Sequence, residues 1–121
     1  MASLLELEAP KYEDKQKIAG LLWKRKETGM KLQVDAVFPY IMGKNTFEVT
    51  LADLKYDSPY NTYLYPGLPP APIANPGLSS IKAAFRPLET PYWFYLSDMK
   101  GNMHYTVTHE EHVINKNRYL R

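Results

Sequence analysis

Hydrophobic positions recur at helical spacing in the segment 13–28, where Ile18, Leu21 and Leu22 lie on one face of a helix. Two acidic residues open this segment and three consecutive basic residues occur near its end, which is the charge order that stabilises a helix dipole. Gly29 follows directly and is well placed as the C-terminal cap. The segment is therefore the clearest predicted helix in the chain.

Weaker patterns predict further elements on either side of this helix. Residues 2–9 are typical of the end of a helix that Pro10 stops, and residues 76–85 suggest another helix. Residues 30–35 alternate between apolar and polar side chains, which predicts a short strand. The apolar run 37–42 is compatible with either a helix or a strand.

The last third of the chain predicts a β-hairpin followed by a helix. Residues 92–96 are rich in aromatic side chains and favour a strand, residues 98–102 favour a turn, and residues 103–107 favour the returning strand. Thr108 is placed to cap a final helix, and the segment 50–53 resembles a capping box. Together these patterns predict an α+β fold, with helices packed around a small antiparallel hairpin in a single domain spanning the whole chain.

A Pro-rich segment, residues 58–77, precedes the hairpin. It contains six prolines and two glycines, yet it also carries three tyrosines, two leucines and an isoleucine. A flexible linker would be poor in such large apolar groups. We therefore expect a long ordered loop that packs on the core, in which Asn61 and Asn75 hydrogen-bond their own backbone. A loop of this kind either carries function or caps the core.

Composition narrows the function classes. The chain is 45% apolar and 23% charged, as in an ordinary globular protein, and its formal charge is +2. Basic and acidic residues are spread evenly, so nucleic-acid binding has little electrostatic support. The absence of Cys excludes a disulfide framework and thiolate metal sites. No apolar stretch is long enough to span a membrane, and no signal peptide is visible.

Two acidic residues near the start are candidates for acid–base chemistry. Glu6 and Glu8 are about 200° apart on a helix, so they cannot share one face. Glu8 follows Leu4 and Leu5 at helical spacing and falls on the face expected to be buried. A carboxyl group held among apolar neighbours resists ionisation, which keeps a general acid protonated near neutral pH. Glu8 is the better catalytic candidate, and a solvated helix acid is the structural alternative.

Three histidines, His104, His109 and His112, lie near the C-terminus. The last two are spaced to share a helix face, as a pair of metal ligands does. No further His lies upstream of these three to serve as another ligand, and the acids between His109 and His112 do not form the zinc-protease pattern. Helix capping or orientation of a loop is favoured, and no metal site is predicted.

Aromatic residues are the remaining chemical resource of the chain, which has ten Tyr, two Trp and four Phe. No nucleophile motif and no glycine-rich phosphate loop is present. Aromatic rings with Asn, Gln and Asp nearby suit sugar binding, because ring faces pack on pyranose faces and polar groups bind the hydroxyls. Core packing is the alternative for most of these rings.

Several unusual motifs occur together in one order, and by them the chain resembles the catalytic domain of the YceG-like endolytic murein transglycosylases. The resemblance covers nearly the whole chain. The matching segments are residues 2–8, 29–35, 58–63, 67–70, 72–77, 80–83, 104–105 and 109–112.

This resemblance implies a bacterial cell-wall enzyme that cuts nascent glycan strands internally and so terminates them. Family members cleave the β-1,4 bond between N-acetylmuramic acid and N-acetylglucosamine without water. The muramyl 6-hydroxyl attacks its own anomeric carbon and leaves a 1,6-anhydro end. One acid/base residue suffices for this chemistry, in contrast to the two carboxylates of ordinary glycosidases, and no cofactor is expected.

The resemblance also implies a cellular context. Full-length family members carry a membrane anchor and a small LysM-like domain before this region. We therefore expect residues 1–121 to be the catalytic domain of a longer protein at the extracytoplasmic face of the bacterial inner membrane. Its expected partners are peptidoglycan glycan strands and cell-wall synthases.

The resemblance assigns roles to individual residues. The family's catalytic glutamate lies in the segment 2–8, and we assign the role to Glu8, with Glu6 as the second choice. Ala9 and Pro10 depart slightly from the family pattern at this point. The residues expected to line the saccharide groove are Gln33, Asp35, Tyr60, Asn61, Thr62 and Tyr63, with Asn75 and the turn 67–70 shaping its floor.

Two other functions remain open from the sequence. A non-catalytic module that binds peptidoglycan or recruits synthases would keep an aromatic groove but would not need Glu8. A muramidase-type hydrolase would use Glu8 together with a second carboxylate such as Asp35.

Overall fold

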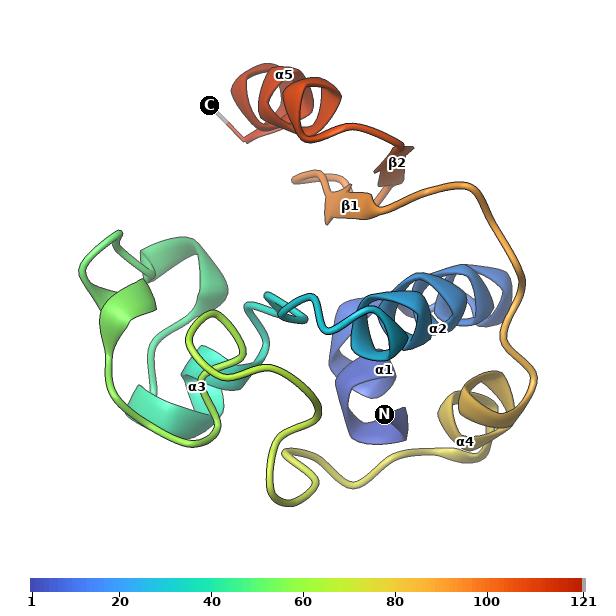
Figure 1. Cartoon of the computed structure of the whole chain (residues 1–121), viewed down its shortest axis with the longest axis horizontal. Helices are drawn as coiled ribbons and strands as arrows, with labels where there is room; N and C mark the ends of the chain where they lie inside the picture. Colours follow the sequence, from blue (N-terminus) through green and yellow to red (C-terminus); the bar gives the residue numbers. More distant parts are fainter. Residues whose placement is uncertain (121) are drawn as a thin grey trace.

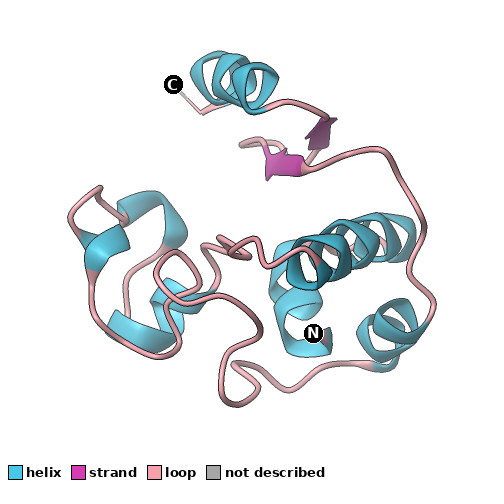
Figure 2. Ribbon diagram, viewed as in Figure 1, coloured by secondary structure: helices cyan, strands magenta, loops and turns pink. Residues whose placement is uncertain are grey.

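The computed structural model describes residues 1–120 and shows an α+β fold, as the sequence predicts. Its helices, strands and short 3₁₀ turns (η) follow the order α1 (Ala2–Glu8), α2 (Tyr12–Glu27), α3 (Val37–Met42), η1 (Thr46–Glu48), η2 (Asp53–Lys55), α4 (Leu78–Phe85), β1 (Phe94–Ser97), β2 (Met103–Thr106) and α5 (His109–Tyr119). Figure 1 shows α1, α2 and α4 gathered on one side and α3 with the two 3₁₀ turns on another. The hairpin and α5 form a third part, and Figure 2 shows how small the sheet is beside the helices.

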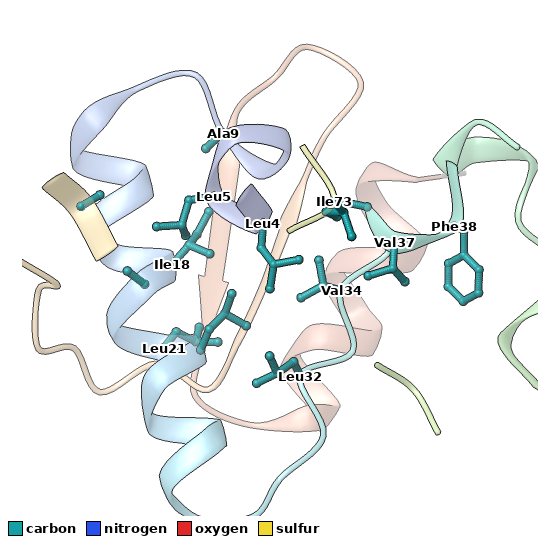
Figure 3. Packing of buried hydrophobic residues seen from close by; sticks show 14 residues of the cluster. Leu4, Leu5, Ala9, Ile18, Leu21, Leu32, Val34, Val37, Phe38 and Ile73 are labelled. Carbon is teal, nitrogen blue, oxygen red and sulfur yellow. The ribbon is translucent and has the colours of Figure 1, made fainter. Parts of the chain in front are cut away.

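The hydrophobic core lies where α1 and α2 meet α4 and the segment that follows α2. The apolar face predicted for α2 is fully buried at Ile18, Leu21 and Leu22. Leu4 and Leu5 of α1 pack on it from the adjoining helix, as Figure 3 shows. Burial of these side chains removes apolar surface from water and is the main stabilising term for the helical part. Gly29 ends α2 with a positive φ of 77°, as expected of a glycine just beyond a helix.

The segment 30–36 is irregular, so the predicted strand over residues 30–35 is wrong. Its alternation arises because Leu32 and Val34 both point into the core and are fully buried. Its backbone groups bond to a side chain and a loop rather than to a strand: the Val34 N–H donates to Thr62 Oγ1 at 2.9 Å. Gln33 adopts a φ of 54°, which no strand residue has. The ambiguous run 37–42 is helical.

The predicted hairpin and final helix are confirmed. Strand β1 pairs antiparallel with β2, with Tyr95 opposite Tyr105. The Asp98 carboxylate organises the turn, because it accepts backbone N–H groups within the turn and bonds the ring of His104. Thr108 and Glu111 form a reciprocal capping box at the start of α5. Thr50 and Asp53 make the same exchange ahead of η2, as the sequence predicts.

The Pro-rich segment 58–77 contains no helix or strand, and two of its polar side chains, Asn61 and Thr62, are buried. Asn61 is fully buried, and its amide donates to the carbonyls of Leu54 and Tyr56 at 3.0 and 2.8 Å. Its oxygen accepts the backbone N–H of Tyr63. Asn61 therefore holds the loop by hydrogen bonds to its own neighbourhood.

Replacing Asn61 by Leu is expected to destabilise the protein by about 2–4 kcal/mol, because the change keeps the volume but leaves buried backbone groups unpaired. Thermal or urea unfolding of the variant measures the loss. Asn117→Leu, on the exposed side of α5, is the matched control and should change stability little. Equal stability of the two variants would contradict the structural role of Asn61.

A close backbone approach joins α2 to the segment that follows α4. The Leu88 N–H donates to the carbonyl of Gln16 at 3.0 Å, and the Gln16 amide donates back to Arg86 O at 2.9 Å. Gly20 lies one helical turn after Gln16, and a Cβ there would come within 1.8 Å of the Leu88 carbonyl oxygen. A glycine is thus required for the close contact between α2 and residues 84–90, which we call the seam.

Candidate active site

A cleft of about 400 Å³ opens where the end of α1, the segment 33–36, η1, β1 and α5 converge. Its walls combine carboxyl, phenol, guanidinium and imidazole groups in one place. Among the residues that line it are Glu8, Arg25, Asp35, Tyr63, Tyr95 and His112. These groups are able to move or stabilise a proton, so we take this cleft as the candidate active site.

Glu8 is the last residue of α1 and reaches the cleft because the helix ends there. Ala9 is extended, at φ −153° and ψ 142°, and Pro10 prevents the helix from continuing. Burial, and then the charge of the nearby Asp35 carboxylate, raise the pKa of the Glu8 carboxyl, which is about 7. Hydrogen bonding from Tyr95 and from the Ala36 backbone N–H, with the charge of Arg25, opposes this rise. Glu8 is thus partly protonated at neutral pH, the state that a general acid needs.

Glu6 has the opposite surroundings, as the helical spacing predicts. Its carboxylate accepts the Gly77 N–H at 2.7 Å and the Ser80 hydroxyl at 2.9 Å, which ties α1 to the start of α4. These hydrogen bonds lower the pKa of Glu6. Glu6 does not line the cleft.

The raised pKa of Glu8 predicts an unusual pH dependence of stability. The folded protein binds the Glu8 proton with a pKa of about 7, against an ordinary value of 4.5, so stability falls as pH rises through this window. Glu8→Gln should therefore be more stable than the parent at pH 8, by up to about 3 kcal/mol, and equally stable at pH 4. Unfolding curves at both pH values measure the difference.

The variant must be compared with the parent at each pH, because His112 changes the pH dependence of stability in the opposite direction to Glu8. Burial lowers its pKa to about 4, so its contribution to stability rises with pH over the same range. Glu6→Gln is the matched control: the pKa of Glu6 is lowered, so this variant should gain nothing at pH 8. Parallel pH curves for Glu8→Gln and the parent would contradict the prediction.

Two phenols accompany the two carboxyl groups of the cleft. The Tyr63 hydroxyl donates to the Asp35 carboxylate, and burial raises the pKa of Tyr63. Burial likewise raises the pKa of Tyr95, and the negative charge of Glu8 adds to the effect. Burial also raises the pKa of Asp35, against the hydrogen bond from Tyr63. Both phenols therefore stay protonated and act as hydrogen-bond donors to the carboxyl groups.

Arg25 lies beneath the cleft, with only 3% of its surface exposed. Its Nη1 donates to the Leu32 carbonyl at 2.5 Å, and its Nε and Nη2 donate to the Trp93 carbonyl at 3.0 and 2.5 Å. One guanidinium thus joins α2 to the segment 30–36 and to the start of β1. Sequence reasoning missed Arg25 by treating it as part of a basic helix end, although it follows Ile18 at the spacing of the buried face.

His112 of α5 forms the opposite wall with Lys116 and stacks on Phe94, with ring centroids 5.2 Å apart. Burial and then the charges of Lys116 and Arg25 lower its pKa to about 4, so the ring is neutral at pH 7. Its Nδ1 is buried without a hydrogen-bond partner among the residues that the structure describes. Within the same residues, no three His, Cys, Asp or Glu side chains gather as metal ligands.

The predicted substrate-binding residues separate into two groups. Gln33, Asp35 and Tyr63 line the cleft with Glu8. Tyr60 packs against Tyr40, and Asn75 is exposed outside the cleft lining. Asn61 and Thr62 are buried and hold backbone groups of the loop and of the segment 30–36. Phe47, which is 66% exposed at the cleft, was not singled out by the sequence, because an isolated aromatic residue carries no motif.

A cleft with one carboxyl group that is partly protonated at neutral pH, a second carboxyl group and flanking aromatic rings is suited to acid-catalysed cleavage of a glycosidic bond. The comparisons agree with this class. The sequence profile of the YceG-like family matches residues 1–118, and the chain belongs to that family.

Two relatives with established names are similar to this chain. The endolytic murein transglycosylase of Bacillus subtilis (strain 168) is 43% identical over 120 residues, which is 99% of this chain and 33% of that protein. The endolytic murein transglycosylase of Streptococcus pneumoniae (serotype 2, strain D39) is 33% identical over 118 residues, covering 93% of this chain and 21% of that protein. The chain therefore spans a third or less of the length of these relatives.

A solved structure shares the fold. The crystal structure of a YceG-like protein from Listeria monocytogenes superposes with a TM-score of 0.86 at 40% identity, covering 94% of this chain and 38% of that one. The relatives are thus larger proteins in which this fold is one part. Within residues 1–120 of the present chain, every helix is too short or too polar to cross a membrane.

Proposed function

We propose that this chain is the catalytic domain of an endolytic peptidoglycan lytic transglycosylase, with Glu8 as its general acid and base. The observation that carries the proposal is the Glu8 carboxyl group at the cleft, with a pKa of about 7. The names of the Bacillus and Streptococcus relatives supply the reaction class and the substrate. A module that only binds glycan gains nothing from burying a carboxyl group at a cost in stability.

In the proposed reaction Glu8 donates one proton and then receives one. Glu8 donates its proton to the oxygen of the bond between N-acetylmuramic acid and N-acetylglucosamine, and the bond from that oxygen to the muramyl anomeric carbon breaks. The muramyl 6-hydroxyl then attacks the anomeric carbon, and its proton returns to Glu8. The product ends in a 1,6-anhydro ring, and no water is consumed.

The other cleft residues have supporting roles in this proposal. Gln33, Asp35 and Tyr63 contact the saccharide directly, while the buried Asn61 and Thr62 act by holding the loop that carries Tyr63. Tyr60 and Asn75 contact more distant parts of a long glycan strand. Synthase partners, a membrane anchor and an extracytoplasmic location remain predictions for the longer parent protein.

A hydrolase is the second candidate, because Asp35 shares the cleft with Glu8 and could activate a water or form a covalent intermediate. In the structure the Asp35 carboxylate is already bonded by Tyr63. That bond directs one carboxylate oxygen to a phenol, and the transglycosylase mechanism needs no second carboxylate.

Digestion of nascent, uncrosslinked glycan strands in ¹⁸O-labelled water tests the proposal. A lytic transglycosylase yields internal fragments with anhydro ends and no solvent oxygen, which mass spectrometry detects as a product one water lighter than a reducing end. A hydrolase yields reducing ends that carry ¹⁸O. Labelled reducing ends that disappear in Asp35→Asn would replace the proposal by the hydrolase, and absence of cleavage would favour the binding module.

A further inference from the structure

Arg25 carries a buried positive charge that forms no ion pair with an acidic side chain within residues 1–120. Its side chain is 3% exposed, and no carboxylate within residues 1–120 lies at ion-pair distance from it. Its three hydrogen bonds all go to carbonyl oxygens, those of Leu32 and Trp93. A buried charge normally needs a counter-charge, because desolvation costs several kcal/mol. Packing alone does not explain why a buried charge without a counter-charge occurs at this position.

A negative charge does arise beside Arg25 if the proposed reaction takes place. Glu8 changes its charge in that reaction, lines the same cleft as Arg25, and interacts electrostatically with it. When Glu8 gives up its proton, a carboxylate forms in a poorly solvated place with Asp35 already nearby. The two carboxylates repel each other there, and a fixed positive charge offsets the cost of that repulsion.

We propose that Arg25 is a positioning residue whose fixed guanidinium stabilises the Glu8 carboxylate formed during bond cleavage and holds in place the two segments that carry Asp35 and Tyr95. This inference rests on the proposed role of Glu8. The guanidinium is oriented before the reaction by carbonyl groups on both sides, so its charge needs no reorganisation when Glu8 ionises. The guanidinium bonds to the carbonyls of Leu32 and Trp93. Leu32 is three residues before Asp35 and Trp93 is two residues before Tyr95, so these bonds hold the segments that carry both cleft residues.

Other charged and titratable groups also face Glu8, so the test must separate them. Those on the neighbouring elements are Asp35, Tyr63, Tyr95, His109, His112 and Lys116. A titration seen at Arg25 is assigned to Glu8 only if replacing Glu8 alone removes it.

The first experiment follows the Arg25 side chain itself by NMR in the unaltered chain. Its Nε–H proton is buried and bonded to the Trp93 carbonyl, so it should exchange slowly enough to be observed. We expect its ¹⁵N shift to titrate with a midpoint near 7, the value for Glu8, and the step to vanish in Glu8→Gln but persist in Glu6→Gln. A step that persists in Glu8→Gln, or no step in the parent, overturns the inference.

The second experiment compares two replacements of Arg25 in the pH profile of cleavage. Arg25→Met removes the charge and should move the alkaline limb of kcat/KM to higher pH by at least about 0.5 unit, with a fall in kcat. Arg25→Lys keeps a positive charge but loses the fixed fork of hydrogen bonds, so it should move the limb less than Arg25→Met does. Equal losses in both folded variants with an unmoved limb would show a merely structural residue.

The outcomes distinguish this inference from the function on which it rests. If Arg25→Met does not fold, the NMR titration of the unaltered chain still decides the inference. If Glu8→Gln cleaves as well as the parent, the proposed function is wrong even where the NMR coupling is present. If Glu8→Gln is inactive and the coupling is absent, the function stands and the role of Arg25 is refuted.

Discussion

Glu8→Gln is expected to reduce the rate of strand cleavage by at least about 100-fold, because general acid catalysis contributes about 10²–10⁴ and Gln cannot donate a proton to the leaving oxygen. The variant keeps the size of the side chain, and the structure predicts that it is no less stable than the parent above pH 7. Loss of activity in a well-folded variant therefore reports chemistry rather than unfolding. Initial rates on uncrosslinked glycan strands measure the effect.

Glu6→Gln is the matched control, two residues away on the same helix. Its amide oxygen can still accept the Gly77 N–H and the Ser80 hydroxyl, so the tie between α1 and α4 survives. We expect its cleavage rate to stay within about threefold of the parent, which is less than 1 kcal/mol in the barrier. The reverse result, an active Glu8→Gln and an inactive Glu6→Gln, would move the acid to Glu6.

The pH profile supports the same assignment independently. The acid must carry its proton before the bond breaks, so kcat/KM should fall as pH rises above about 7, the pKa of Glu8. Asp35→Asn removes the charge that raises this pKa and should shift the limb toward lower pH. An alkaline limb that does not move in Asp35→Asn would show that the limb belongs to another group.

Gly20→Ala is expected to destabilise the protein by about 3 kcal/mol or more. Alanine alone would favour the helix by about 1 kcal/mol over glycine, so packing must decide the sign. The added Cβ would come within 1.8 Å of the Leu88 carbonyl oxygen, and this neighbour is backbone that cannot rotate away. The helix and the following segment must separate by more than an ångström.

That separation would break the hydrogen bonds of the seam. Besides those of Gln16, the Trp23 indole donates to Ala84 O at 3.1 Å and the Lys24 amine donates to Thr90 O at 3.0 Å. We expect the melting temperature to fall by roughly 10 °C or more. Lys26→Ala, at an exposed position of the same helix, should leave it nearly unchanged. A melting temperature for Gly20→Ala equal to or above that of the parent would show that the seam opens without cost.

Local sequence patterns predicted most of the fold because the elements concerned are stabilised by contacts close in sequence. The helix α2 was predicted within one residue at each end, and the capping box of α5 and the hairpin turn were found from their side chains. The error over residues 30–35 has a definite cause. Alternating burial is typical of strands, but here Arg25 and Thr62, not a neighbouring strand, take the hydrogen bonds.

The candidate site was predictable only in part. Glu8 could be separated from Glu6 by helical geometry, because three or four residues of local structure decide which face each occupies. Asn61 and Thr62 were expected to line the groove from the resemblance to the YceG-like family, and not from any local pattern in the sequence. The structure buries both, because the irregular loop needs their side chains to satisfy its own backbone.

The sequence by itself determined most of the helices, the hairpin, the caps and the different faces of α1 that carry Glu6 and Glu8, since each depends on spacing within a few residues. Only the tertiary structure decided that Asp35, Tyr63 and Tyr95 meet Glu8 in one cleft, and that Arg25 lies beneath them. The physical reason is distance along the chain. The bond from Arg25 to Trp93 joins residues 68 positions apart, and no local pattern records which distant carbonyl a buried guanidinium will find.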